Sequence, residues 1–167
     1  MHIVMVGVGY VGLVSGVCFS DLGHHVICVD NDPSKLVQLE KGEVPIYEPG
    51  LNEVLLRNVG EGRLSFTGNL AEALKNADAV FIAVGTPTRS QDWHTDLSYV
   101  FAAAEEIAKS AKRYIVIVTK ATVPVGTNRK IEQLLAKTNP ALDFDVVSNP
   151  EFLREGSAVN DFMRPDR

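Results

Sequence analysis

Three glycines and one acidic residue near the start of the chain constrain its fold more than any other feature. Gly7, Gly9 and Gly12 follow an apolar run over residues 3–6, and Asp30 closes the next apolar run. This is the G-x-G-x-x-G pattern in the setting it requires, where a strand leads through a tight turn into a helix and then into a strand that ends in a carboxylate. The pattern predicts a βαβ unit that binds a dinucleotide.

Each residue of this pattern has a physical role. Gly7 permits the tight turn, Gly9 leaves space that a side chain would deny to a pyrophosphate, and Gly12 lets helix and strand pack closely. The helix amino terminus offers unpaired N–H groups and a positive dipole end to the phosphates. Asp30 can accept hydrogen bonds from both adenosine ribose hydroxyls and would repel a 2′-phosphate, so we expect NAD rather than NADP. The alternative is a glycine-rich turn that only connects packed elements.

Composition excludes several classes of protein. The 167 residues suit one domain with a substantial core, and a formal net charge of −5 gives no basic surface for nucleic acid. Residues 3–19 are apolar, but no Lys or Arg precedes them and four glycines interrupt them, unlike a signal peptide or membrane anchor. We therefore expect a cytoplasmic protein without membrane or nucleic-acid partners. Cys18 and Cys28 lie in apolar stretches and are expected to be buried structural thiols, spaced unlike a metal site.

Strand and helix patterns alternate along the chain. Residues 79–84 are continuously apolar, which is typical of a parallel strand buried on both faces. The alternation predicts an α/β doubly wound parallel sheet, the Rossmann fold, with six strands in the order 3-2-1-4-5-6. The expected strands are residues 2–6, 25–30, 63–67, 79–84, 114–119 and 144–148. The expected helices are residues 10–22, 33–41, 49–58, 70–76, 97–110 and 125–137, with Pro33 and Pro124 opening two of them.

Ligands of such sheets bind at the carboxyl ends of the strands, so the residues that follow each strand are candidates. Thr86, after the fourth strand, could contact a coenzyme or form an ordinary turn. Thr122, after the fifth, could contact a ligand or cap the next helix. Glu151 and Glu155, after the sixth, would lie on one side of a helical turn. Such like charges destabilise a helix, so they indicate either function or a solvated turn.

Taken together, these segments resemble the UDP-glucose 6-dehydrogenase family, within the wider UDP-glucose/GDP-mannose dehydrogenase group. The segments that match occur in order along the whole chain: residues 7–12, 29–30 with Lys35, 45–51, 85–87, 96–100, 122–127, 148–156 and 162–167. Residues 46–47 and 162–167 look more like the UDP-glucose branch than the GDP-mannose branch. One departure is Ala121, where the family commonly has serine.

The resemblance implies an oxidoreductase that converts UDP-glucose to UDP-glucuronate, a step of nucleotide-sugar metabolism that supports polysaccharide biosynthesis, in two successive NAD-dependent oxidations. Thr122 would order a water for proton transfer and Glu155 would hold or activate a water for hydrolysis, which makes these two the catalytic candidates. The implied coenzyme-binding residues are Gly7, Gly9, Tyr10, Val11, Gly12, Asp30, Lys35, Gly85, Thr86, Thr122 and Glu155. The implied substrate-side residues are Glu151, Phe152, Leu153, Arg154 and Glu155.

The family's cysteine nucleophile lies beyond its NAD domain, and neither Cys18 nor Cys28 is in an element that could supply it. We expect residues 1–167 to be one NAD-binding Rossmann domain, cut before the linker helix and the nucleotide-sugar domain, that binds NAD without completing the reaction. The parent enzyme is expected to be a homo-oligomer. A dehydrogenase for GDP-mannose or UDP-N-acetylmannosamine and a free-standing NAD-binding sensor are the alternatives. A methyltransferase that uses S-adenosylmethionine is disfavoured by the complete glycine pattern.

Overall fold

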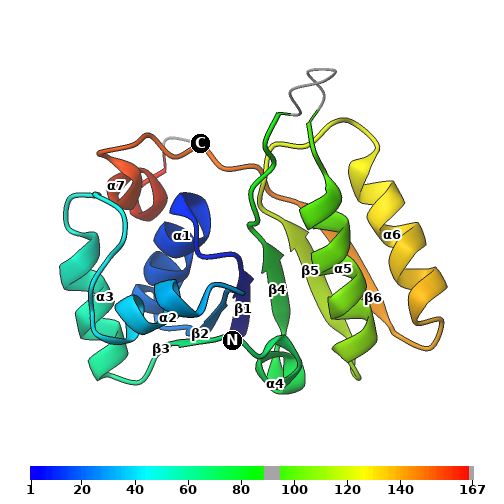
Figure 1. The fold of residues 1–167 in the computed structure, drawn as a ribbon, viewed down its shortest axis with the longest axis horizontal. Coiled ribbons are helices and arrows are strands. Elements are labelled where there is room, and N and C mark those ends of the chain that lie inside the picture. The colour runs from blue at the N-terminus through cyan, green and yellow to red at the C-terminus, as the bar shows by residue number, and fades with distance from the viewer. Residues whose placement is uncertain (89–94, 166–167) are drawn as a thin grey trace.

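A single parallel sheet organises the chain. The computed structural model describes residues 1–88 and 95–165; residues 166–167, the end of the last segment matched above, lie outside this range. Six strands pair in the order β3-β2-β1-β4-β5-β6, with helices on both faces (Figure 1). Every pairing between neighbouring strands is parallel. The doubly wound fold and the strand order predicted from the sequence are confirmed.

The strands are β1 (His2–Val6), β2 (His25–Val29), β3 (Leu64–Thr67), β4 (Ala79–Ile82), β5 (Ile115–Thr119) and β6 (Phe144–Ser148). The helices are α1 (Tyr10–Asp21), α2 (Pro33–Glu40), α3 (Leu51–Gly60), α4 (Leu70–Ala73), α5 (Ser98–Ser110), α6 (Thr127–Thr138) and α7 (Ala158–Met163), and the 3-10 turn η1 (Leu74–Asn76) follows α4. No helix within the described ranges is long and apolar enough to cross a membrane.

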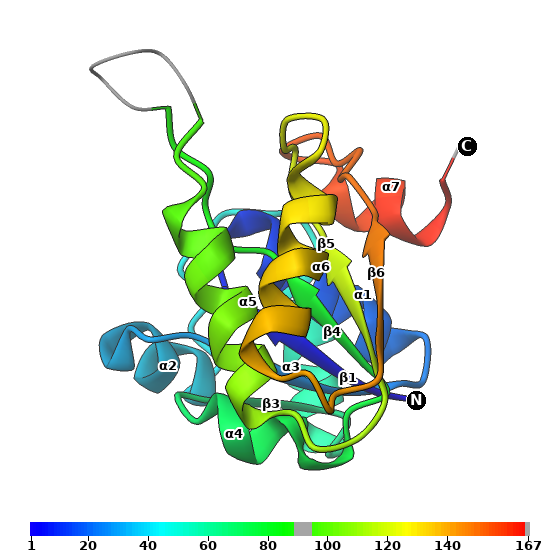
Figure 2. The same ribbon diagram turned by 90° about the vertical axis from the view of Figure 1, so that its right-hand side faces the viewer.

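Two apolar clusters cover the two faces of the sheet. On one face α1 packs against β1 and β2, α3 and α7 pack against α1, and Leu13 and Leu51 are fully buried. On the other face α5 and α6 lie side by side (Figure 2) and bury Ile107 and Ile131 against β4 and β5. Burial on both faces explains why these strands are continuous apolar runs.

The starts of two helices differ from the sequence prediction. Pro33 does open α2, and the Asp32 side chain caps it, as expected. Pro124 does not open α6, because its carbonyl accepts the N–H of Thr127 in a turn that ends at the left-handed Gly126 (φ 89°). The predicted start of α3 is two residues early for the same reason, since Gly50 is also left-handed (φ 78°). A residue with positive φ lies outside a right-handed helix, so each helix begins after its glycine.

Helix α7 was not assigned as an element from the sequence. It packs against α1, with Ala158 fully buried and the ring of Phe162 edge-on to Phe19 at 4.9 Å between centroids. Cys18 of α1 and Cys28 of β2 lie in the same apolar cluster as free, buried thiols, as predicted. The packing of α7 on α1 thereby brings the end of the chain beside the helix that follows the glycine-rich turn.

Candidate active site

The three glycines after β1 serve different purposes. Gly7 has a φ of 95°, and a methyl group there would lie 2.9 Å from the Ala83 carbonyl oxygen. A methyl group at Gly12 would overlap the Gly7 carbonyl oxygen. At Gly9 a methyl group would meet no atom of the described chain within 4 Å. The fold itself therefore requires Gly7 and Gly12, whereas the bare backbone at Gly9 faces open space, as a bound pyrophosphate would need.

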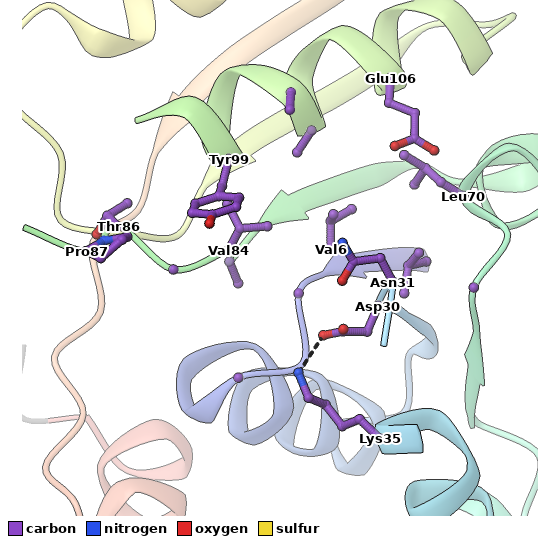
Figure 3. Close-up of a pocket in the computed structure, with 18 residues that line it drawn as sticks. Val6, Asp30, Asn31, Lys35, Leu70, Val84, Thr86, Pro87, Tyr99 and Glu106 are labelled. Atoms are coloured by element: carbon purple, nitrogen blue, oxygen red, sulfur yellow. Dashed lines mark hydrogen bonds and ion pairs between the residues drawn. The ribbon is translucent and has the colours of Figure 1, made fainter. Parts of the chain in front are cut away.

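A cavity of about 770 Å³ begins at this turn and follows the carboxyl ends of β1, β2 and β4. Figure 3 shows it as an elongated space, with Leu70 and Glu106 at one end and Thr86 and Pro87 at the other. Its volume lies within the range of small-molecule and cofactor sites. The sequence candidates that line it are Gly7, Gly9, Asp30, Lys35, Gly85 and Thr86. Asn31, Leu70, Tyr99 and Glu106 also line it and were not singled out from the sequence.

Asp30 is fixed in the cavity wall by three donors. Its Oδ2 accepts the N–H of Val8 at 2.9 Å and the ammonium of Lys35 at 3.1 Å, and its Oδ1 accepts the N–H of Asp32 at 3.0 Å. An ionised carboxylate has about four acceptor positions, so roughly one remains for a ligand. If Asp30 is to accept from both ribose hydroxyls, as the sequence predicts, Lys35 must release Oδ2 and turn its charge toward the ligand.

Thr122 is not the cap of α6. The N-cap of that helix is Gly126, and the Thr122 hydroxyl instead donates to Oε1 of Glu151 at 3.4 Å. Oε2 of Glu151 is buried and has no hydrogen-bond partner in the described part of the chain. A buried polar atom left without a partner indicates a position that a ligand or water completes. The structure therefore brings Thr122 and Glu151 together, from the ends of β5 and β6.

Lys120, directly after β5, joins the end of that strand to the end of β6. Its side chain is buried, and its ammonium donates to Oδ1 of Asn149 at 2.9 Å. Burial lowers the pKa of Lys120, and the negative charge of Glu151 partly opposes this by favouring the ammonium. Lys120 was not singled out from the sequence, where a lysine directly after a strand has no distinguishing pattern.

The expectation that Glu151 and Glu155 share a helical turn is wrong. The chain from residue 149 to residue 154 has no regular structure, and α7 begins only at Ala158. Gly156 has a φ of 85°, which ends any helix before it. The Asp161 carboxylate also accepts the Arg154 N–H at 3.0 Å, so that donor is used in closing the segment onto α7.

Arg154 is paired rather than free to meet a ligand. Its guanidinium forms an ion pair with Asp161 at 2.6 Å, and this pairing lowers the pKa of the Asp161 carboxyl. Phe152, Leu153 and Arg154 line a second cavity of about 610 Å³ with Lys120 and Asn149. Tyr10, Val11, Gly12, Thr122 and Glu155 line neither this cavity nor the first. The assigned roles of these candidates stay predictions.

Glu48 is a residue that sequence reasoning missed, although its segment was matched. Glu48 belongs to the α2–α3 loop, and its buried carboxylate contacts the start of α1 and the start of α7. Burial alone would raise the pKa of Glu48, but hydrogen bonds from the Tyr10 hydroxyl and from backbone N–H groups hold it below the usual value. Burial and the bond to Glu48 raise the pKa of Tyr10 to about 12.

Comparison with known proteins identifies the family. The family model described as "UDP-glucose/GDP-mannose dehydrogenase family, NAD binding domain" matches residues 1–167. The chain belongs to this family. It is the family's NAD-binding domain, which agrees with the glycine turn, the fixed carboxylate and the elongated cavity described above.

Named relatives and solved structures agree with this assignment. The chain is 59% identical to the UDP-glucose 6-dehydrogenase of Rhizobium meliloti (strain 1021) over 167 residues, which is 100% of the chain and 38% of that protein. It is 49% identical to the UDP-glucose 6-dehydrogenase TuaD of Bacillus subtilis (strain 168), covering 99% of the chain and 36% of that protein. Two structures are similar over 99% of the chain and 39% of theirs: a UDP-glucose dehydrogenase from Pyrobaculum islandicum (TM-score 0.94, 46% identity) and a GDP-mannose dehydrogenase from Pseudomonas aeruginosa (TM-score 0.92, 36% identity).

Proposed function

We propose that this chain is the coenzyme domain of a UDP-glucose 6-dehydrogenase, which oxidises UDP-glucose to UDP-glucuronate in two NAD-dependent steps. The observation that carries the proposal is the 59% identity to a UDP-glucose 6-dehydrogenase over the whole chain, compared with 36% to a GDP-mannose dehydrogenase of similar fold. The fold alone does not distinguish the substrates, because both structures superpose closely. A dehydrogenase for GDP-mannose is therefore the second candidate.

The residues around the first cavity fit NAD in chemistry and placement. Gly9 and the amino terminus of α1 would receive the diphosphate, and Asp30 with Lys35 would hold the adenosine ribose. Thr86, at the far end of the cavity, and its chain neighbour Gly85 would line the nicotinamide half. Bound NAD+ supplies the acceptor for the hydride that leaves carbon 6 of the sugar.

Thr122 and Glu151 would together hold the water molecule that takes up the proton leaving the sugar hydroxyl. Because the Thr122 hydroxyl donates to Glu151, its lone pairs are free to accept from a water molecule. That water would have the unpaired Oε2 of Glu151 as a second partner. Glu155 would hold or activate a water for the later hydrolysis, and the segment from Glu151 to Glu155 would lie against the sugar.

A cysteine nucleophile would come from outside this chain. Burial raises the pKa of Cys18 and of Cys28 to about 12, so both sulfurs are unreactive thiols near neutral pH. The chain spans 38% of the length of the Rhizobium meliloti relative. The proposal therefore includes a second domain that supplies the nucleophile and the nucleotide-sugar site, a homo-oligomeric parent enzyme and a cytoplasmic location.

Titration calorimetry with NAD+, NADP+ and S-adenosylmethionine tests the coenzyme assignment. We expect NAD+ to bind at least ~10-fold more tightly than NADP+, because Asp30 repels a 2′-phosphate, and S-adenosylmethionine not to bind. Equal affinity for NAD+ and NADP+ would contradict this use of Asp30.

Turnover of the parent enzyme with UDP-glucose and with GDP-mannose tests the substrate, and preference for GDP-mannose would select the second candidate. Sustained NADH formation by residues 1–167 alone would refute the need for an outside cysteine.

A further inference from the structure

Glu48 occupies an unusual position in the molecule. It lies in the loop between α2 and α3, and the residue is 6% exposed. Its neighbours in the chain, Tyr47 and Pro49, are exposed, and Tyr47 is 88% exposed. A carboxylate is rarely buried unless donors satisfy it, so its partners indicate why this one points inward.

Those partners come from two distant parts of the chain. Oε2 accepts the hydroxyl of Tyr10 and the N–H of Gly156, the latter at 2.8 Å, and Oε1 accepts the N–H of Ala158 at 2.8 Å. Three donors satisfy most of the acceptor positions of one ionised carboxylate. These bonds hold the charge inside the apolar cluster where α1 and α7 meet.

Both partners adjoin residues of the proposed site. Tyr10 follows Gly9 and is the first residue of α1, where the coenzyme diphosphate is expected. Gly156 follows Glu155, the residue expected at the reacting centre. The Tyr10 hydroxyl and the Gly156 N–H donate to the same oxygen of Glu48, so the start of α1 and the end of this segment lie near each other. The Glu48 carboxylate thus contacts Tyr10, which adjoins the expected diphosphate site, and Gly156, which adjoins the expected reacting centre.

We propose that Glu48 is a positioning residue that couples coenzyme binding to the order of the segment formed by residues 151–157, a role that rests on the proposed function. A ligand on the amino terminus of α1 restrains Tyr10, and Glu48 transmits that restraint to the N–H groups of Gly156 and Ala158. The coenzyme would in this way prepare the substrate-side segment before the sugar arrives.

A purely structural brace would hold the segment equally with and without coenzyme, so the test must measure the response to NAD+. Hydrogen exchange of the Gly156 and Ala158 amides, followed by NMR with and without saturating NAD+, gives that response directly. The variants are Tyr10→Phe, which removes one donor, and Glu48→Gln, which puts an amide NH2 among donors. The matched controls are Tyr47→Phe and Glu43→Gln, which change exposed side chains of the same loop.

In the wild type and both controls we expect NAD+ to slow exchange at these two amides by about 10-fold or more. Tyr10→Phe should keep the free-state exchange rate within about 2-fold but lose most of the NAD+ response, since only the link to α1 is cut. Glu48→Gln should exchange about 10-fold faster even without NAD+ and also lose the response. A Tyr10→Phe variant in which NAD+ slows exchange as much as in the wild type would overturn the proposal. That result decides the question even if Glu48→Gln fails to fold.

Calorimetry on the same samples separates failure of NAD+ binding from failure of the coupling through Glu48. A wild-type protein that binds no NAD+ would refute the proposed function and with it the coupling. A wild-type protein that binds NAD+ while the Gly156 and Ala158 amides exchange at an unchanged rate would refute the coupling alone.

Discussion

Replacing Gly9 or Gly12 by alanine separates what the glycine turn does for the ligand from what it does for the fold. Gly9 has a φ of −71° and a ψ of −169°, which alanine adopts without strain, and its methyl group would enter open space. At Gly12 the same methyl group would overlap the Gly7 carbonyl oxygen and reach within 3.2 Å of the Ala83 Cβ. The same substitution, glycine to alanine, therefore places its methyl group in open space at Gly9 and against backbone at Gly12.

The expected stability changes follow from these environments. At Gly9, alanine is a poorer N-cap by about 0.5–1 kcal/mol, but it gains about 0.4–1 kcal/mol from reduced freedom of the unfolded chain, so the two terms nearly cancel. At Gly12, alanine is intrinsically better in a helix by about 1 kcal/mol, yet forced overpacking against backbone costs about 1–3 kcal/mol or more. In a domain of this size each 1 kcal/mol shifts Tm by about 2–4 °C.

The assay measures Tm by calorimetry and Kd for NAD+ by titration on the same preparations. Gly9→Ala should keep Tm within about 3 °C of the wild type while losing about 10-fold or more in NAD+ affinity, because its methyl group stands where the pyrophosphate approaches. Gly12→Ala should lower Tm by several degrees. Wild-type affinity in Gly9→Ala, or an unchanged Tm in Gly12→Ala, would refute this division of roles.

Three further outcomes are expected. Asp30→Asn removes the charge that opposes a 2′-phosphate, so the Kd ratio of NADP+ to NAD+ should fall by about 10-fold in calorimetry; an unchanged ratio would show that another group discriminates. In the parent enzyme, Thr122→Val should lower kcat by about 100-fold with little change in NAD+ affinity, and a wild-type kcat would exclude Thr122 from proton transfer. Hydrogen bonding to Arg57 lowers the pKa of Asp21 in the folded state, so its stabilising effect is full above the unfolded pKa and is lost as pH falls through the folded pKa. Chemical denaturation should therefore show that Asp21→Asn is less stable than the wild type at neutral pH, with a gap that narrows below about pH 4; a constant gap would contradict the linkage.

The sequence predicts the sheet well because its signals there are local. Continuous apolar runs identify buried parallel strands, and the glycine spacing fixes the order of strand, turn and helix. The sequence prediction starts α3 and α6 two residues early, because the left-handed Gly50 and Gly126 come directly before Leu51 and Thr127. A left-handed glycine reads in the sequence like any other glycine, and only its φ shows that the helix begins after it.

Most of the sequence candidates that line the first cavity come directly after a strand. Asp30 and Thr86 line the first cavity as expected, since strand ends in a parallel sheet converge on one edge. The role of Glu48 depends on Gly156 and Ala158, which are 108 and 110 residues away in the chain. No periodic pattern reports such a contact. The sequence also gives no sign that the Arg154 N–H donates to Asp161 of α7 instead of forming the helical turn expected for Glu151 and Glu155.

The two buried cysteine sulfurs can be used to measure how often this part of the domain transiently unfolds. An alkylating reagent reacts with thiolate, and within the fold neither Cys18 nor Cys28 offers one or is reachable from solvent. Labelling therefore requires transient unfolding of α1 from β2, so its rate at mild denaturant concentrations measures how often that part of the molecule separates. A maleimide gel-shift experiment can thus rank variants by stability without any optical probe, and added coenzyme should visibly delay the shift.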